Sequence, residues 1–178
     1  EDVSTLTSAT ANLSETNAVL STGGTLSLTD LDATAATVVA QTGTAGSYGS
    51  FVINSAGVWT YTTSSALNNL NAGQTASESF TVATTDGGSA TVTVNITGSE
   101  DVSTLTSATA NLSETNAVLS TGGTLSLTDL DATAATVVAQ TGTAGTYGSF
   151  VINSAGVWTY TTSSALNNLN AGQAASET

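Results

Sequence analysis

Aspartate and glutamate are the side chains of this sequence with the clearest capacity for chemistry. The 178 residues include 13 Asp and Glu and no Lys, Arg, His or Cys, so the formal net charge is −13. Such a chain lacks the common general bases, the thiol nucleophile and the cations that stabilise developing negative charge. Carboxylates with backbone carbonyls can still bind Ca²⁺, which prefers oxygen ligands. We therefore predict a calcium-binding protein and no enzymatic activity.

Two carboxylates one residue apart form the strongest local motif. Asp30 and Asp32 follow a predicted strand, and the pair recurs as Asp129 and Asp131. Both side chains of a pair can approach one cation, whereas glycoside hydrolysis needs carboxyl groups that face each other across a cleft. Zinc and copper are disfavoured because the sequence offers neither His nor Cys.

Further acidic residues lie at predicted strand ends and at the junction between two sequence repeats. With no basic partner, they favour cation binding, and the predicted metal ligands are Asp2, Asp30, Asp32, Asp86, Glu100, Asp101, Asp129 and Asp131. Additional candidates for such a cluster are Glu15, Glu78 and their counterparts Glu114 and Glu177. The alternative is that these carboxylates are solvated surface groups and that Asp86 is a turn residue before Gly87.

The sequence repeats itself with a period of 99 residues. The segment Glu1-Asp2-Val3 recurs as Glu100-Asp101-Val102, and the two copies differ at three positions over their shared length. A unit of this size can bury a core of its own, so we predict one domain at residues 1–99 and a second at residues 100–178. We expect the second to be truncated, because it has no counterpart of residues 80–99, which contain the last two predicted strands.

Short runs of alternating apolar and polar residues predict an all-β domain of antiparallel strands. The clearest hairpin joins residues 50–53 to residues 58–61, and Asp86-Gly87-Gly88 predicts a second. Trp59 and Phe80 are predicted core residues, and residues 64–71 suit a helical turn whose leucines plug one end of the domain. The predicted strands of one copy span residues 10–14, 24–29, 37–42, 48–54, 58–62, 77–84 and 90–97.

The charge also bears on possible partners. Nucleic acid and anionic membrane are both bound through Lys or Arg, so we expect neither as a partner. No apolar run is long enough for a transmembrane helix, so we expect no direct membrane insertion. Without Cys, an extracellular domain needs a stabilising device other than disulfides, such as bound metal.

Several motifs resemble a known family when they are taken in order. They occupy residues 24–33, 42–51, 56–61, 70–74 and 79–82 and the Asp86-Gly87-Gly88 turn. The sequence resembles the VCBS-type, immunoglobulin-like or cadherin-like repeats of large bacterial RTX-type adhesins over essentially the whole repeat. The family's units commonly close with Asn-Asp, whereas Ser99-Glu100-Asp101 stands at this boundary.

The resemblance implies a fold and a function. The fold is a series of tandem immunoglobulin-like antiparallel β-sandwich repeats, in which each repeat has its neighbours as partners. The function is that of a calcium-stiffened spacer in a secreted, extracellular protein at the bacterial cell surface, which supports adhesion and biofilm formation.

Two other functions stay open. A face of the repeat can bind a glycan or a protein, since sandwiches also serve as lectins. Alternatively, the chain can be a self-assembling extracellular filament or surface-layer subunit, in which an unpaired sheet edge accepts a strand from a neighbouring molecule.

Overall fold

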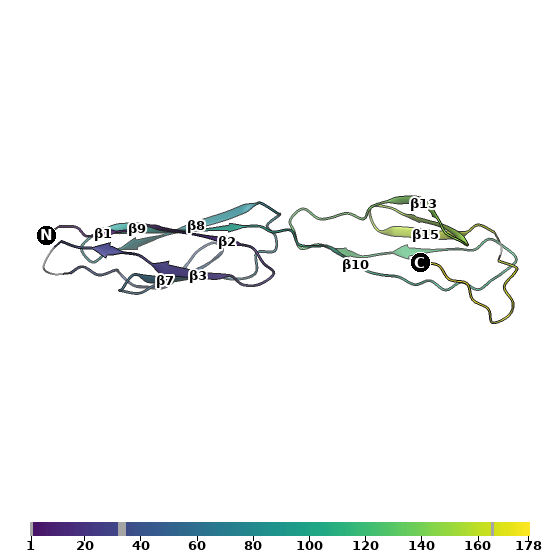
Figure 1. Ribbon diagram of the computed structural model, residues 1–178, viewed down its shortest axis with the longest axis horizontal. Helices are drawn as coiled ribbons and strands as arrows, with labels where there is room; N and C mark the ends of the chain where they lie inside the picture. Colours follow the sequence, from purple (N-terminus) through teal and green to yellow (C-terminus); the bar gives the residue numbers. More distant parts are fainter. Residues whose placement is uncertain (1, 32–34, 165) are drawn as a thin grey trace. The chain divides into compact units, whose positions relative to one another are not determined.

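The computed structural model describes residues 2–31, 35–164 and 166–178, and their regular secondary structure consists of β-strands (Figure 1). The contacts divide the chain into two compact units. The first comprises Glu1–Asp101 with Leu130–Thr133, and the second comprises Val102–Asp129 with Ala134–Thr178. Within the described residues, no helix has the length and apolar character needed to cross a membrane.

Two sheets and a short strand pair build the first unit. The larger sheet has the order β3 (Ser21–Thr25), β7 (Val58–Thr63), β6 (Gly49–Ile53), β5 (Gln41–Ala45). The smaller sheet has the order β2 (Ala9–Ser14), β9 (Ser89–Thr97), β8 (Thr75–Ala83), and β1 (Thr5–Leu6) pairs with β4 (Leu28–Thr29). The pairs are antiparallel as predicted, except that β2 lies parallel to β9.

The core of the first unit lies between these two sheets. Alternate side chains of β7 and β8 point inward, and Trp59 and Phe80 are 4% and 5% exposed, which confirms their predicted place in the core. Phe51 of the larger sheet stacks on Phe80 of the smaller one with ring centroids 4.8 Å apart. Burial of each large apolar side chain contributes about 1.5–3 kcal/mol, so this layer holds the sandwich together.

The predicted hairpin between β6 and β7 is confirmed. The Asn54 side chain accepts hydrogen bonds from the N–H groups of Ala56 and Val58, both at 3.0 Å, and Gly57 has a φ of 80°. Only glycine adopts this backbone conformation without strain.

The loop between β7 and β8 differs from the expectation. Leu67 and Leu70 are buried as predicted, but the segment forms a turn closed by the hydrogen bond from Leu70 N–H to Leu67 C=O at 3.0 Å, not a helix.

Two predicted strands are divided differently because the chain passes from one sheet region to another. The strand predicted at residues 24–29 is the end of β3, paired with β7, followed by β4, paired with β1. The strand predicted at residues 37–42 contains a single bridge from Val38 to Thr84 and then enters β5, which pairs with β6. Local alternation continues through both changes of partner, so it does not reveal them.

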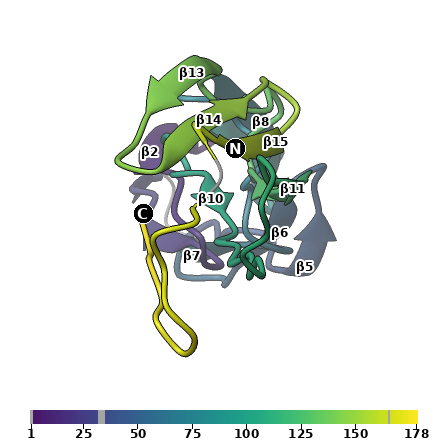
Figure 2. The same cartoon turned by 90° about the vertical axis from the view of Figure 1, so that its right-hand side faces the viewer.

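The second unit repeats the larger sheet of the first. Its order is β11 (Ser120–Thr124), β15 (Val157–Thr162), β14 (Gly148–Ile152), β13 (Gln140–Ala144), and β10 (Thr104–Leu105) pairs with β12 (Leu127–Thr128). Figure 2 shows β13, β14 and β15 side by side. The registers match those of the first unit, with Gly123 opposite Trp158 as Gly24 is opposite Trp59.

Identical residues are buried differently in the two units. Phe51 is 0% exposed, whereas its counterpart Phe150 lines a pocket of about 380 Å³ together with Leu125 and Ile152. In the first unit the equivalent residues pack against β8 and β9. Covering by the second sheet therefore accounts for the difference.

Candidate metal centre

Glu15 is a buried carboxylate at the end of β2. It is 3% exposed, its N–H donates to Thr97 C=O at 2.7 Å, and its Oε2 accepts from Ser99 N–H at 3.3 Å. The parallel pairing of Ser14 with Thr97 brings it to this place. Its Oε1 is buried and receives no hydrogen bond from the described residues. A buried charged oxygen without a hydrogen-bond donor destabilises the folded protein by more than about 1–3 kcal/mol. Binding of a cation to this carboxylate would therefore stabilise the fold.

Asp101 is a second buried carboxylate, and it lies two residues after Ser99. It is 8% exposed, and its Oδ2 is also buried without a donor from the described part of the chain. Its backbone N–H donates to Oδ2 of Asp131 at 3.2 Å. Asp131 comes from the segment Leu130–Thr133, which belongs to the first compact unit. The structure thus joins two of the predicted metal ligands directly.

The loop between β7 and β8 closes this cluster. The Asn71 side-chain oxygen accepts from Thr133 N–H at 2.8 Å. The carbonyl oxygens of Asn71 and Leu70 lie so near Gly98 that a Cβ there would be 2.3 Å and 2.7 Å from them. The missing side chain of Gly98 therefore lets the loop lie beside Ser99 and Glu15. In the same loop, Asn68 Oδ1 is buried with no donor among the described residues.

We call this cluster the acidic corner, and its members are Glu15, Asn71, Asp101 and Asp131. Its side chains carry carboxylate and amide oxygens, which suit a hard cation such as Ca²⁺. In the described part of the chain, however, no group of three or more acidic side chains is placed so that it could hold a metal ion. A cation at this corner therefore needs amide, backbone or water oxygens as well, as Ca²⁺ sites with six to eight ligands commonly have.

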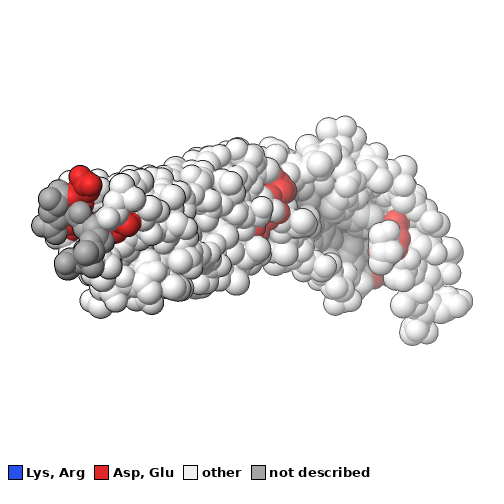
Figure 3. All heavy atoms as spheres, turned by 60° about the vertical axis from the view of Figure 1, so that its left-hand side comes forward, with Lys and Arg blue, Asp and Glu red and all other residues white. Residues whose placement is uncertain are grey.

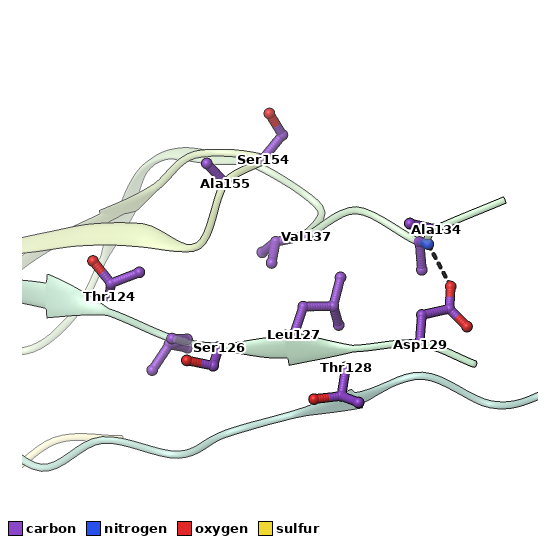
Figure 4. A pocket seen from close by; sticks show the side chains of 11 residues that line it. Thr124, Ser126, Leu127, Thr128, Asp129, Ala134, Val137, Ser154 and Ala155 are labelled. Atoms are coloured by element: carbon purple, nitrogen blue, oxygen red, sulfur yellow. Dashed lines mark hydrogen bonds between the residues drawn. The ribbon is translucent and has the colours of Figure 1, made fainter. Parts of the chain in front are cut away.

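The other predicted ligands are exposed, lie outside the described residues or accept other hydrogen bonds. Asp2 and Glu100 are exposed, and Asp32 lies outside the described residues. Asp30 Oδ2 accepts from Ala36 N–H at 2.5 Å. In the second unit, Asp129 accepts from Ala135 N–H at the end of a pocket of about 590 Å³ (Figure 4). Figure 3 shows the acidic side chains as separate patches on an otherwise uncharged surface.

Asp86 receives several donors from the protein itself. Its carboxylate accepts from the Thr84 hydroxyl, from the Ser4 N–H at 2.5 Å and hydroxyl at 2.8 Å, and from Gly88 N–H at 3.4 Å. The Thr84 hydroxyl first, and the Ser4 backbone next, hold the pKa of Asp86 well below its usual range. These bonds attach the start of the chain to the turn between β8 and β9.

Glu78 bridges the two sheets. Its carboxylate accepts from the Tyr61 hydroxyl and, at 3.2 Å, from Tyr48 N–H. Burial, followed by the bond to Glu78, raises the pKa of the Tyr61 hydroxyl. Glu177 makes the same pair of contacts with Tyr147 and Tyr160. Their recurrence in both copies indicates a structural role for these two glutamates.

Sequence reasoning named Glu15 as a further candidate and did not single out Asn68 or Asn71. The loop was interpreted from its leucines, and neutral amides stand out little in a chain rich in Asn and Thr. One signal that could have found them is the number of Asn residues in the short segment 68–71, since amide oxygens are calcium ligands.

The chain is all-β, and the two sheets of its first unit face each other across one core. This architecture is that of an immunoglobulin-like β-sandwich repeat. The model of the bacterial cadherin-like domain family matches residues 1–98, which is more than half of the chain. The chain therefore belongs to the bacterial cadherin-like domain family, which confirms the predicted fold class and family. No curated protein matches it. Membership indicates an extracellular adhesion-type repeat, and domains of this kind are structural or adhesive modules that generally bind calcium.

Proposed function

We propose that this protein is a spacer repeat of a large secreted bacterial adhesin of the RTX type, and that calcium bound at the acidic corner stiffens it. The observation that carries the proposal is the pair of buried carboxylate oxygens, Glu15 Oε1 and Asp101 Oδ2, to which the described chain supplies no hydrogen-bond donor. A protein with no Lys, Arg or His has to compensate this charge with an ion from solution.

Glu15 and Asp101 are the proposed carboxylate ligands, and backbone, amide or water oxygens would complete the set. Ca²⁺ would supply positive charge and bind Oε1 of Glu15 and Oδ2 of Asp101. The Ser99 N–H donates to the other oxygen of Glu15 and so orients this carboxylate. Glu15 belongs to the first sequence copy and Asp101 to the second. One ion would thus link consecutive copies and restrict the junction between them.

The remaining predicted ligands are related to the acidic corner by the 99-residue period of the sequence. Asp2 stands 99 residues before Asp101, so in an array it would serve the equivalent corner of a preceding copy. Asp32, which lies outside the described residues, stays a proposed ligand from the sequence motif. We keep Glu100, Asp30 and Asp129 as proposed calcium ligands on the basis of the sequence motifs. We do not assign Asp86 to calcium in this proposal, because it receives hydrogen bonds from Ser4, Thr84 and Gly88.

The spacer function rests on the repeat and on the absence of catalytic chemistry. Near-identical copies of about 100 residues in series extend a chain without adding any new site. Outside the cell, such an array would project an adhesive domain from the bacterial surface and support attachment and biofilm formation. We also propose that residues 1–99 and 100–178 are the two repeats of this array.

Calcium titration of the 178-residue chain by isothermal calorimetry tests the proposal. We expect binding to the wild type and a loss of roughly tenfold or more in affinity for Glu15→Gln and Asp101→Asn, because each removes a charged ligand. Asp86→Asn is the control, with unchanged affinity expected. Absence of calcium binding to the wild type at millimolar concentration would refute the proposal.

A further inference from the structure

We infer that the open face of the second unit is a docking surface for a β-hairpin of the β8–β9 type that another polypeptide chain supplies. The open face is the side of the sheet β11–β15–β14–β13 whose counterpart in the first unit lines the core. The large side chains on it are those of Leu125, Phe150, Ile152, Trp158 and Tyr160. Among the described residues of the second unit, no strand corresponds to β8 or β9. The inference is independent of the calcium site, since it uses none of the residues of that site.

The apolar side chains of the open face are less covered than their counterparts in the first unit. Phe51 is 0% exposed, whereas Phe150 is half-buried. Leu6 is 7% exposed, whereas its counterpart Leu105 is 45% exposed. Both Leu105 and Phe150 line the pocket of about 380 Å³, which is otherwise lined mainly by aliphatic side chains. A contiguous apolar face of this kind is typical of a surface that a partner covers.

The first unit shows which partner fits this face. There, β8 and β9 lie across the core from β3 and β7 (Figure 1). Phe80 of β8 stacks on Phe51 with ring centroids 4.8 Å apart. The inward side chains of the hairpin are at most 7% exposed, and they are Phe80, Val82, Ala90, Val92, Val94 and Ile96. Because the strands of the larger sheet have the same residues in both units, the same hairpin side chains match the open face.

One anchor of this arrangement is already present in the second unit. Glu177 accepts a hydrogen bond from the Tyr160 hydroxyl at 3.0 Å, as Glu78 of β8 does from the hydroxyl of Tyr61. Glu177 therefore lies where the first part of β8 lies in the first unit. The partner has to supply only the equivalent of residues 80–97, which comprise the rest of β8, the turn and β9.

The hairpin of the chain itself cannot take this place while it keeps its connection. In the first unit, Ser4 donates to Asp86 at the turn that precedes β9, so Ser103 would have to reach the same turn. The nine residues of β9 span about 26 Å, and Thr97 lies at its far end. The six residues from Thr97 to Ser103 reach at most about 22 Å. The hairpin must therefore come from another chain.

A second copy of the open face is a less suitable partner than a hairpin. Two open faces would oppose the rings of Phe150, Trp158 and Tyr160 with equally large side chains, whereas the hairpin opposes them mainly with Val and Ala. Large side chains facing small ones fill a core without voids. The segment 80–97 carries a single charged residue, Asp86, so its docking avoids the repulsion between two chains of net charge −13.

The test is a calorimetric titration of the full 178-residue chain with a synthetic peptide of residues 80–97. We expect one peptide to bind per chain. Phe80→Ala in the peptide should weaken binding by roughly a hundredfold or more, because the ring that would face Phe150 is lost. Thr81→Ala is the matched control, since this side chain is exposed in the first unit, and it should leave the affinity unchanged. Because these changes are in the peptide, they do not alter the fold of the chain.

Tryptophan fluorescence identifies the unit that binds the peptide. The chain has two tryptophans, so Trp59→Phe leaves Trp158 as the reporter and Trp158→Phe leaves Trp59. The peptide should shift the emission of Trp158 to shorter wavelength, because the docked hairpin removes this side chain from water. It should leave the emission of Trp59, which is 4% exposed, unchanged.

Three results would overturn the inference. The first is the absence of binding at millimolar peptide, or equal binding of the Phe80→Ala peptide. The second is a shift in the emission of Trp59 alone, since the peptide would then have replaced the hairpin of the first unit. The third is a dimer of the chain, seen by sedimentation at several concentrations, that the peptide does not dissociate. Such a dimer would assign the open face to a second copy of the chain.

Discussion

The backbone N–H of Asp101 donates a hydrogen bond to the side-chain oxygen Oδ2 of Asp131, 3.2 Å away and 30 residues later in the sequence. The bond orients one carboxylate of the acidic corner while the other, that of Asp101, keeps a buried oxygen without a donor from the described residues. The backbone of one acidic residue therefore positions the side chain of another. Two acidic residues that would repel each other are therefore held together by this hydrogen bond.

Removal of calcium should destabilise the protein. A ligand that binds only the folded state at a hundredfold excess over its Kd contributes about 2.7 kcal/mol, which corresponds to roughly 10 °C in melting temperature for a domain of this size. Differential scanning calorimetry in calcium and in EDTA measures the shift, and magnesium at equal concentration is the control. Identical curves in calcium and EDTA would contradict the prediction.

Glu15→Gln should change stability in opposite directions with and without calcium. In EDTA the variant should be more stable than the wild type by about 1 kcal/mol, because a buried charge without a partner is removed. In calcium it should be less stable, because a ligand is lost. Urea unfolding under both conditions tests this.

Glu114→Gln is the matched control for Glu15→Gln, since Glu114 is exposed and should change stability by less than about 0.5 kcal/mol. A Glu15 variant that is destabilised equally in EDTA and calcium would show that this glutamate serves only the packing of β2 and β9.

The attachment of Ser4 to the turn between β8 and β9 should depend on pH, because Ser4 donates its hydrogen bonds to the Asp86 carboxylate. The pKa of Asp86 is lowered from its usual 3.8 by the Thr84 hydroxyl and the Ser4 backbone, so its contribution is present above pH 3.8 and lost as the pH falls through the lower value of the folded state. Asp86→Asn should remove this part of the pH dependence and speed hydrogen exchange at Ser4.

Exchange followed by NMR between pH 2 and pH 6 measures this effect, and Asp2→Asn, at an exposed position, is the control. Equal protection of Ser4 in the Asp86 variant and the wild type would show that other contacts hold this segment.

Tyr61→Phe should destabilise the first unit by about 1–3 kcal/mol, because it leaves the Glu78 carboxylate without the Tyr61 hydroxyl. Since burial and Glu78 raise the pKa of Tyr61 above its usual 10.0, wild-type stability should also fall as the pH rises past 10.0, where the unfolded chain ionises. The variant should lose less stability in that range.

The matched variant Tyr160→Phe should have a smaller effect, since Tyr160 is only half-buried. Urea titrations of both variants at neutral and alkaline pH provide the comparison, and equal losses in the two would contradict a role for burial.

The strands show how far local pattern determines structure. Residues 9–14 and 108–113 have the same sequence, yet only the first segment forms a strand, β2, because β9 is present to pair with it. In contrast, the hairpin of β6 and β7 and that of β14 and β15 form in both units, since each has its partner within a few residues. Short-range pairs follow from local sequence, and long-range pairs depend on which strands fold against each other.

By itself, the sequence determined the all-β class, the 99-residue repeat and the core positions of Trp59 and Phe80. These features depend on alternation, turn residues and composition, all of which act locally. Only the tertiary structure decided that Glu15, Asn71, Asp101 and Asp131 belong to one corner. Four separate segments meet there through the β2–β9 pairing, the Gly98 contact and the hydrogen bonds of the junction, and no local pattern in the chain encodes such a meeting.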